Sequence, residues 1–179
     1  MSASFDDPFL TLDLPRVFGV DAATLRRAYL AKSALLHPDL ATDSEAPRRM
    51  AALNQAKRTL EDPERRANAL LAILGGPAAS QDRRLPEGFL FQMMETREAI
   101  EETAAASNNE QERERWQTWA EEQRRQAISE VATMFDALSS PPSVEALADI
   151  RIRLNAWRYI ERLIEQLDPD YDPNAADFR

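Results

Sequence analysis

Residues 21–39 read DAATLRRAYLAKSALLHPD, and this stretch decides how the first part of the chain folds. Asp21 is a good helix N-cap, because its carboxylate accepts a backbone N–H of the first turn. Large apolar residues follow at helical spacing, at Leu25, Tyr29 and Leu36. Pro38 disfavours helical backbone at the residue before it, so the helix ends at about Leu36. The stretch therefore predicts an amphipathic helix followed by a loop that begins His37-Pro38-Asp39.

Three further helices are predicted around this one. A short helix lies within Phe9–Phe18 and is interrupted near Pro15. The helix after the loop runs from about Glu45 to Leu60. Its inward-facing residues are Met50, Leu53, Ala56 and Leu60. Another helix starts at Asp62-Pro63, since proline is tolerated in the first helical turn, and ends at Gly75-Gly76-Pro77. Its apolar side carries Ala67, Leu70, Leu71 and Leu74.

Three longer helical segments follow, over about residues 87–106, 110–139 and 143–167. The breaks between them are short, so we expect neighbouring helices to run antiparallel in a three-helix bundle. With a rise of about 1.5 Å per residue, the middle helix is about 45 Å long and the bundle is elongated. The inward-facing residues include Trp116, Trp119, Val131, Phe135, Leu138, Leu147, Ile150, Leu154, Trp157 and Ile164.

The fold class is therefore all-α, because β-branched residues are sparse and no strict alternation persists. We expect an N-terminal domain over residues 1–76 and a linker over residues 77–88. The bundle occupies residues 89–168. We expect the tail, residues 169–179, to be disordered because it has no apolar period.

The composition excludes several classes of function. The 179 residues contain no cysteine and one histidine, which excludes disulfides, cysteine-bound zinc and histidine-cluster metal sites. The four glycines form no phosphate-binding loop. The net charge of −9 arises wholly from residues 77–179, so neither nucleic acid nor an anionic membrane is an expected partner. We expect a protein that is not an enzyme and that has no cofactor and no bound metal.

The neighbourhood of the HPD loop resembles a known domain. The loop lies between Leu25-Arg-Arg-Ala-Tyr29 and Leu53-Asn-Gln-Ala-Lys-Arg-Thr-Leu60, an arrangement similar to the J-domain of DnaJ-type co-chaperones. Asp62-Pro-Glu-Arg-Arg-Ala-Asn-Ala-Leu-Leu71 and Leu90-Phe-Gln-Met-Met-Glu-Thr-Arg-Glu98 extend the resemblance to HscB, the J-type co-chaperone of iron–sulfur cluster assembly. The resemblance covers about Asp7 to Leu167. It implies an N-terminal J-domain, a helical hairpin with an HPD loop, followed by an elongated C-terminal three-helix bundle.

The resemblance also implies a chaperone-binding surface. In this family the HPD loop and the helix before it dock on the ATPase of a DnaK/HscA-class chaperone and stimulate it. Carried onto this chain, the docking residues are His37, Pro38, Asp39, Arg26 and Arg27. Two features depart from the family: Leu40-Ala41 stands where a basic and an aromatic residue are usual, and few cations lie on the outward face of the helix. We therefore expect docking to depend less on salt than is usual.

The first bundle helix carries two apolar sectors. Phe89, Met93, Ile100 and Ala104 share one face and make a normal core stripe. Leu90, Phe91 and Met94 lie on a second face together with carboxylates, a composition typical of either a partner site or a wide core. The resemblance implies that this second face binds the iron–sulfur scaffold IscU. The implied scaffold-binding residues are Leu90, Phe91, Met94, Glu95, Glu98, Glu102 and Tyr159.

The first hypothesis is a co-chaperone that brings the scaffold to the chaperone and stimulates its ATPase. The chain starts without a signal or transit peptide, and with the family resemblance this favours a bacterial cytoplasm. A J-domain co-chaperone for a different client, or a helical interaction module with an inert HPD loop, remains an alternative. A carboxylate enzyme ranks last, because nothing in the sequence converges on a pocket. The acidic residues near Glu112 interleave with arginines, which favours a solvated helix face over a metal site.

Overall fold

The computed structural model describes residues 7–36, 45–105 and 110–167, and these residues contain helices and no strand. The all-α prediction is confirmed. The helices are α1 (Pro8–Thr11), α2 (Ala22–Leu35), α3 (Ala46–Glu61), α4 (Pro63–Ile73), α5 (Phe89–Ala105), α6 (Glu110–Asp136) and α7 (Val144–Leu167).

Local side chains set where these helices begin. The Asp21 carboxylate accepts a hydrogen bond from the Thr24 backbone N–H at 2.8 Å, and this bond lowers the pKa of Asp21. Asp62 caps α4 by accepting the Arg65 backbone N–H at 3.0 Å, with Pro63 in the first turn. The helix starts predicted at both aspartates are confirmed.

The first helix is shorter than the sequence predicts. Asp7 caps α1, with its Oδ1 accepting the backbone N–H groups of Phe9 and Leu10 at 2.9 and 3.0 Å. The helix then ends at Thr11, well before Pro15. Asp13 adopts a φ of 52°, the left-handed conformation that an α-helix does not continue through. This backbone conformation, and not the proline, stops the helix.

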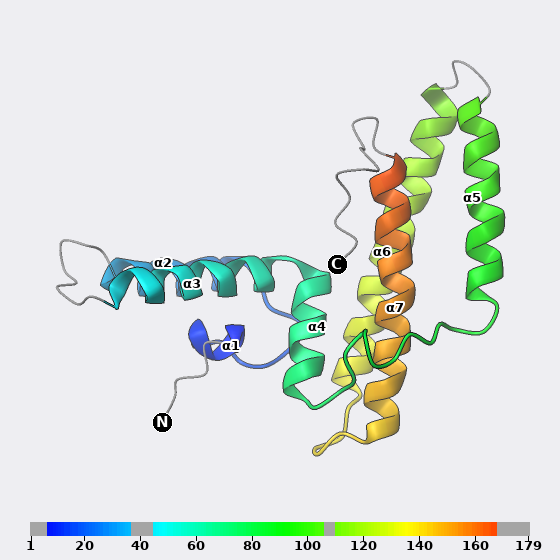
Figure 1. Cartoon of the computed structure of the whole chain (residues 1–179). Helices are drawn as coiled ribbons and strands as arrows, with labels where there is room; N and C mark the ends of the chain where they lie inside the picture. The colour runs from blue at the N-terminus through cyan, green and yellow to red at the C-terminus, as the bar shows by residue number, and fades with distance from the viewer. Residues whose placement is uncertain (1–6, 37–44, 106–109, 168–179) are drawn as a thin grey trace.

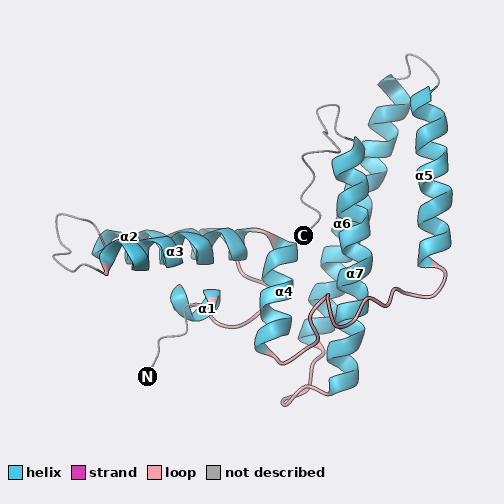
Figure 2. Cartoon of the chain, in the orientation of Figure 1, coloured by secondary structure: helices cyan, strands magenta, loops and turns pink. Residues whose placement is uncertain are grey.

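The helices form two arms joined by α4 (Figure 1). The hairpin of α2 and α3 projects sideways from an upright bundle of α5, α6 and α7, and α1 packs against α3. α4 stands beside the bundle and packs against α7. The connection from α4 to α5 runs as a loop along the bundle (Figure 2).

The hairpin is closed by apolar packing and by polar contacts of Tyr29. Leu53, Ala56 and Leu60 are buried on α3, as predicted, and Met50 is half-buried against them. The Tyr29 hydroxyl of α2 donates to Oδ1 of Asn54 on α3 at 2.8 Å. This bond ties the two helices together midway along the hairpin.

The bundle is held most tightly between α6 and α7. Trp157 is fully buried, and its Nε1 donates to the Glu161 carboxylate at 2.7 Å. The same carboxylate accepts Nε of Arg124 on α6 at 2.8 Å. A second ion pair, Arg153 with Glu130, also joins α7 to α6. These contacts anchor a shared core to which α5 adds Phe89 and Met93.

The hairpin arm and the bundle share one continuous apolar core. The Phe18 ring stacks on Phe135 of α6, with ring centroids 5.7 Å apart. Glu64 of α4 lies 3.6 Å from Arg158 of α7, and burial raises the pKa of Glu64 despite this cation. Arg151 of α7 is buried, and it donates to the Pro77 carbonyl at 2.9 Å and to Asn68 Oδ1 at 2.8 Å.

We expect Arg151→Met to lower the free energy of unfolding by about 2–3 kcal/mol, because the Asn68 and Pro77 oxygens lose a charged donor in a buried place. Urea denaturation followed by circular dichroism measures this loss. Arg115→Met is the matched control, since exposed Arg115 pairs with Glu112 one turn away and its loss costs less than about 0.5 kcal/mol. Equal losses in the two variants would contradict a structural role for Arg151.

Candidate functional site

The first candidate surface is the outward face of α2, made of Arg26, Arg27, Leu30, Ala31 and Ala34, which we call the α2 outer face. All five side chains are at least partly exposed. The predicted docking residues His37, Pro38 and Asp39, and the departure at Leu40-Ala41, lie outside the described residues, between the end of α2 and the start of α3. Of the predicted chaperone-binding set, the structure therefore places Arg26 and Arg27 on the surface.

The α2 outer face is more apolar than basic. Leu30 is 53% exposed, and Leu35, which lies beside this face and was missed from the sequence, is 74% exposed. Arg27 donates to the Thr24 hydroxyl of its own helix at 2.8 Å. Lys32 pairs with Asp13 at 2.8 Å. Helical spacing could have predicted the exposure of Leu35, because this residue falls outside the stripe formed by Leu25, Tyr29 and Leu36.

The second candidate surface is on α5, where the two apolar sectors predicted from helical spacing separate. Phe89 and Met93 are each 8% exposed, so they belong to the core. Leu90, Phe91 and Met94 are 50%, 68% and 57% exposed. We call these three residues the apolar patch. A helix that leaves three large apolar side chains in solvent presents a surface suited to a partner.

Carboxylates surround the apolar patch. Glu95, Glu98 and Glu102 are exposed and lie four, seven or eight residues beyond patch residues, so they share the outward side of α5. This combination of apolar centre and charged rim is typical of protein interfaces. The carboxylates repel anions and favour a partner that is positively charged around its own apolar residues.

Tyr159 brings α7 to the same end of α5. Its ring is 41% exposed and meets Phe89 edge-on, with ring centroids 6.1 Å apart. Phe89 immediately precedes Leu90 and Phe91, so Tyr159 lies at the N-terminal end of the patch. The structure therefore places Tyr159 against Phe89, next to the start of the patch, whereas Glu98 and Glu102 lie two to three helical turns further along α5.

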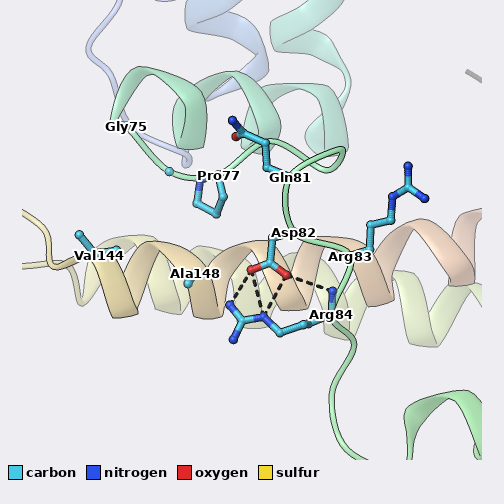
Figure 3. A pocket seen from close by; sticks show the side chains of 9 residues that line it. Gly75, Pro77, Gln81, Asp82, Arg83, Arg84, Val144 and Ala148 are labelled. Atoms are coloured by element: carbon cyan, nitrogen blue, oxygen red, sulfur yellow. Dashed lines mark hydrogen bonds and ion pairs between the residues drawn. The ribbon is translucent and has the colours of Figure 1, made fainter.

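Other features of the described residues add no further site of this kind. Among them no group of three or more His, Asp or Glu side chains is arranged to hold a metal ion. None of their helices combines the length and the apolarity needed to cross a bilayer. An open pocket of about 830 Å³ lies between residues 75–84 and the start of α7. The polar side chains at its centre, Asp82 and Arg84, bind each other (Figure 3).

Comparison with known protein families assigns both parts of the chain. Residues 7–69 match the DnaJ domain, and residues 85–168 match the family described as the HscB C-terminal oligomerisation domain. The chain is 31% identical over 175 residues to the co-chaperone protein HscB homolog of Paraburkholderia phymatum, covering 94% of this chain and 99% of the relative. It is 32% identical over 169 residues to the Burkholderia multivorans homolog, covering 88% and 96%.

Solved structures share this fold. The chaperone HscB from Vibrio cholerae superposes with a TM-score of 0.72 at 24% identity, covering 90% of this chain and 94% of the other. The human co-chaperone protein HscB gives a TM-score of 0.72 at 23% identity, covering 90% and 80%. Since curated relatives align over nearly their full length and both domains match in order, the chain belongs to the HscB family of J-domain co-chaperones.

Proposed function

We propose that this protein is an adaptor between two partners in iron–sulfur cluster assembly. Its C-terminal bundle binds the IscU-type scaffold protein through the apolar patch, the surrounding carboxylates and Tyr159. Its HPD loop and α2 outer face dock on a DnaK/HscA-class chaperone and stimulate the chaperone's ATPase, which promotes cluster assembly and transfer. The observation that carries the proposal is the exposed apolar patch with its carboxylate rim, on a chain of the HscB family.

The patch has the physical properties of a binding centre. Burying a side chain of the size of Phe91 or Met94 contributes about 1.5–3 kcal/mol, so three such residues supply a large share of a typical protein–protein affinity. The glutamates contribute less affinity, but they raise the association rate of a positively charged partner and select its orientation. An IscU-type scaffold that presents apolar residues flanked by cations suits this surface.

The chemistry of ATP hydrolysis belongs to the chaperone, and this chain contributes no catalytic residue and no cofactor. Asp39 carries a carboxylate suited to a bidentate pair with an arginine of the chaperone. Contacts that favour one chaperone conformation lower the barrier to hydrolysis there. The protein works as a regulator of a partner enzyme.

The joined arms give the two surfaces a defined separation. α4 packs against α7, so the hairpin arm is seated directly on the bundle that carries the patch (Figure 1). Holding two partners on one body raises the effective concentration of each toward the other without any new contact. We place this activity in a bacterial cytoplasm, as the Paraburkholderia and Burkholderia relatives support, with no nucleic acid or membrane partner.

A second candidate role for the patch is self-association, because the matching C-terminal family is described as an oligomerisation domain. A second copy of this chain carries the same carboxylates, so their repulsion disfavours patch-to-patch contact. A J-domain co-chaperone for a different client and an interaction module with an inert HPD loop are the remaining alternatives.

We expect the protein and the scaffold together to raise the steady-state ATPase rate of the host's DnaK/HscA-class chaperone by about fivefold or more. His37→Gln is expected to return the rate to that of chaperone with scaffold alone, because the loop loses its imidazole. Circular dichroism of the variant controls for its fold. A variant that stimulates as well as the wild type would favour the inert interaction module.

We expect Phe91→Ala to weaken binding to the apo scaffold about 10–100-fold, the loss expected from about 1.5–3 kcal/mol of apolar burial. Isothermal titration calorimetry measures the affinity. Val144→Ala is the matched control, since Val144 is 77% exposed on α7 and its truncation leaves the affinity within about twofold. Equal effects of the two substitutions would remove the patch from the interface, and sedimentation of the free protein tests whether the patch instead joins two copies.

We expect the affinity for the chaperone to fall by less than about tenfold between about 0.05 M and 0.5 M salt, because the α2 outer face is mainly apolar. Leu30→Ala is expected to weaken docking more than Arg26→Ala. Fluorescence anisotropy of labelled protein at several salt concentrations measures both effects. A steep linear fall of log affinity with log salt would show that cations dominate docking.

A further inference from the structure

Residues 77–84, which join α4 to α5 and which we call the strap, are fastened to α7. The strap contains no helix, yet its backbone carbonyls accept hydrogen bonds from two α7 side chains. Asn155 Nδ2 donates to the carbonyls of Asp82 and Arg84, both at 2.9 Å. Arg151 Nε donates to the Pro77 carbonyl at 2.9 Å. One face of α7 therefore holds both ends of the strap.

The strap is also stiffened from within. The Asp82 carboxylate accepts Nη2 of Arg84 at 2.6 Å and the Arg84 backbone N–H at 3.0 Å (Figure 3). These bonds lower the pKa of Asp82 to about 2, so the carboxylate stays ionised and keeps its partner at neutral pH. Gln81 Oε1 accepts the Ala78 backbone N–H at 2.9 Å. Because these bonds stiffen the strap, the position at which α7 holds it also constrains the residues that follow, up to the start of α5.

The strap leads into the first turn of α5. Arg84, the last residue held by Asn155, precedes Phe89 by five positions. Phe89 rests against Tyr159, which lies one helical turn beyond Asn155 on α7. Asn155 and Tyr159 thus form two successive supports on one helix, the first for the strap and the second for the start of α5. The patch residues Leu90 and Phe91 come directly after this start.

α5 depends on these supports because it buries little of its own surface. Among its residues whose exposure the structure describes, Phe89 and Met93 are buried, and both lie in its first two turns. α7, by contrast, buries side chains from Leu147 to Leu163 along most of its length. A helix with few buried side chains is fixed weakly by packing alone. The fastening of the strap therefore adds a support at the N-terminal end of α5, beside the packing of Phe89 and Met93.

We propose that Asn155 is a positioning residue for the surface formed by the apolar patch and Tyr159. By holding the strap to α7, it fixes the start of α5 and so the placement of Leu90, Phe91 and Met94 beside Tyr159. Arg151 also donates to Asn68 of α4, so it links the strap to α4 as well as to α7. The effect of Asn155 on scaffold binding rests on the proposed function. Its effect on the placement of α5 is a property of the free protein and does not.

The placement of α5 is tested first without any partner. The chain has no cysteine, so Gln92→Cys on α5 and Arg162→Cys on α7 introduce two nitroxide labels at exposed positions. Pulsed electron paramagnetic resonance gives the distance distribution between them. We expect a narrow distribution in the otherwise wild-type protein and a broader one in Asn155→Asp, which replaces the donor by a carboxylate that repels both carbonyls.

Two further variants make this test specific. Asn155→Ala removes the donor without adding charge, and we expect it to broaden the distribution as well, so the result does not depend on the folding of one variant. Gln117→Glu makes the same charge change at an exposed position of α6 and is expected to leave the distribution unchanged. A distribution that stays narrow in both Asn155 variants would overturn the proposal.

The functional consequence is tested with the apo IscU-type scaffold and with the chaperone alone. We expect Asn155→Asp to weaken scaffold binding by roughly tenfold while stimulation of the chaperone ATPase in the absence of scaffold is retained. Equal loss of both activities would indicate general destabilisation and overturn the positioning role, as would unchanged scaffold affinity with a broadened distribution. If the wild type itself fails to bind the scaffold, the proposed function fails, whereas the label distances still decide the role of Asn155.

Discussion

The packing of α4 against α7 is the contact on which the rest of this structure depends. α4 follows directly from the hairpin, and its buried Leu70 and Leu71 belong to the same core as Ile150 and Leu154 of α7. Phe18 reaches the bundle at Phe135 and extends this core. Without the packing of α4 against α7, the hairpin and the bundle would be two domains joined by a loop, and each would be free to reorient. With this packing, the α2 outer face and the apolar patch of α5 are held at fixed positions relative to each other.

Polar groups at the contact between α4 and α7 fix the relative position of the two helices. Arg151 is buried, and burial lowers its pKa, yet its hydrogen-bond partners are the neutral oxygens of Asn68 and Pro77. Desolvating the charge of Arg151 is costly, and its hydrogen bonds offset this cost. These bonds form only when α4, the strap and α7 lie in one relative position, so they select that arrangement. The raised pKa of Glu64 at the same interface reflects the same desolvation.

In the proposed function, the two surfaces bind different partners. The α2 outer face and the HPD loop bind the chaperone, and the α5 surface binds the client. Both surfaces rely on exposed apolar side chains, with Leu30 on one and Phe91 on the other. Their charges differ, since carboxylates surround the α5 patch. Under the proposed function, this difference would disfavour binding of the client at the chaperone's docking surface.

The sequence by itself determined the helices, the starts of α2 and α4 at Asp21 and Asp62, and the two sectors of α5, because helical spacing and capping are local patterns that each segment carries alone. It misplaced the end of α1, which Asp13 sets by its left-handed backbone. Only the tertiary structure decided how the arms meet and that the strap is fastened. The bonds from Arg151 and Asn155 to the strap join residues 71 to 74 positions apart. They run from side chains to backbone carbonyls in a polar segment that lies between Gly75-Gly76 and Gly88 and that the sequence predicts to be a linker. Bonds of this kind follow no helical spacing, so the sequence does not reveal them.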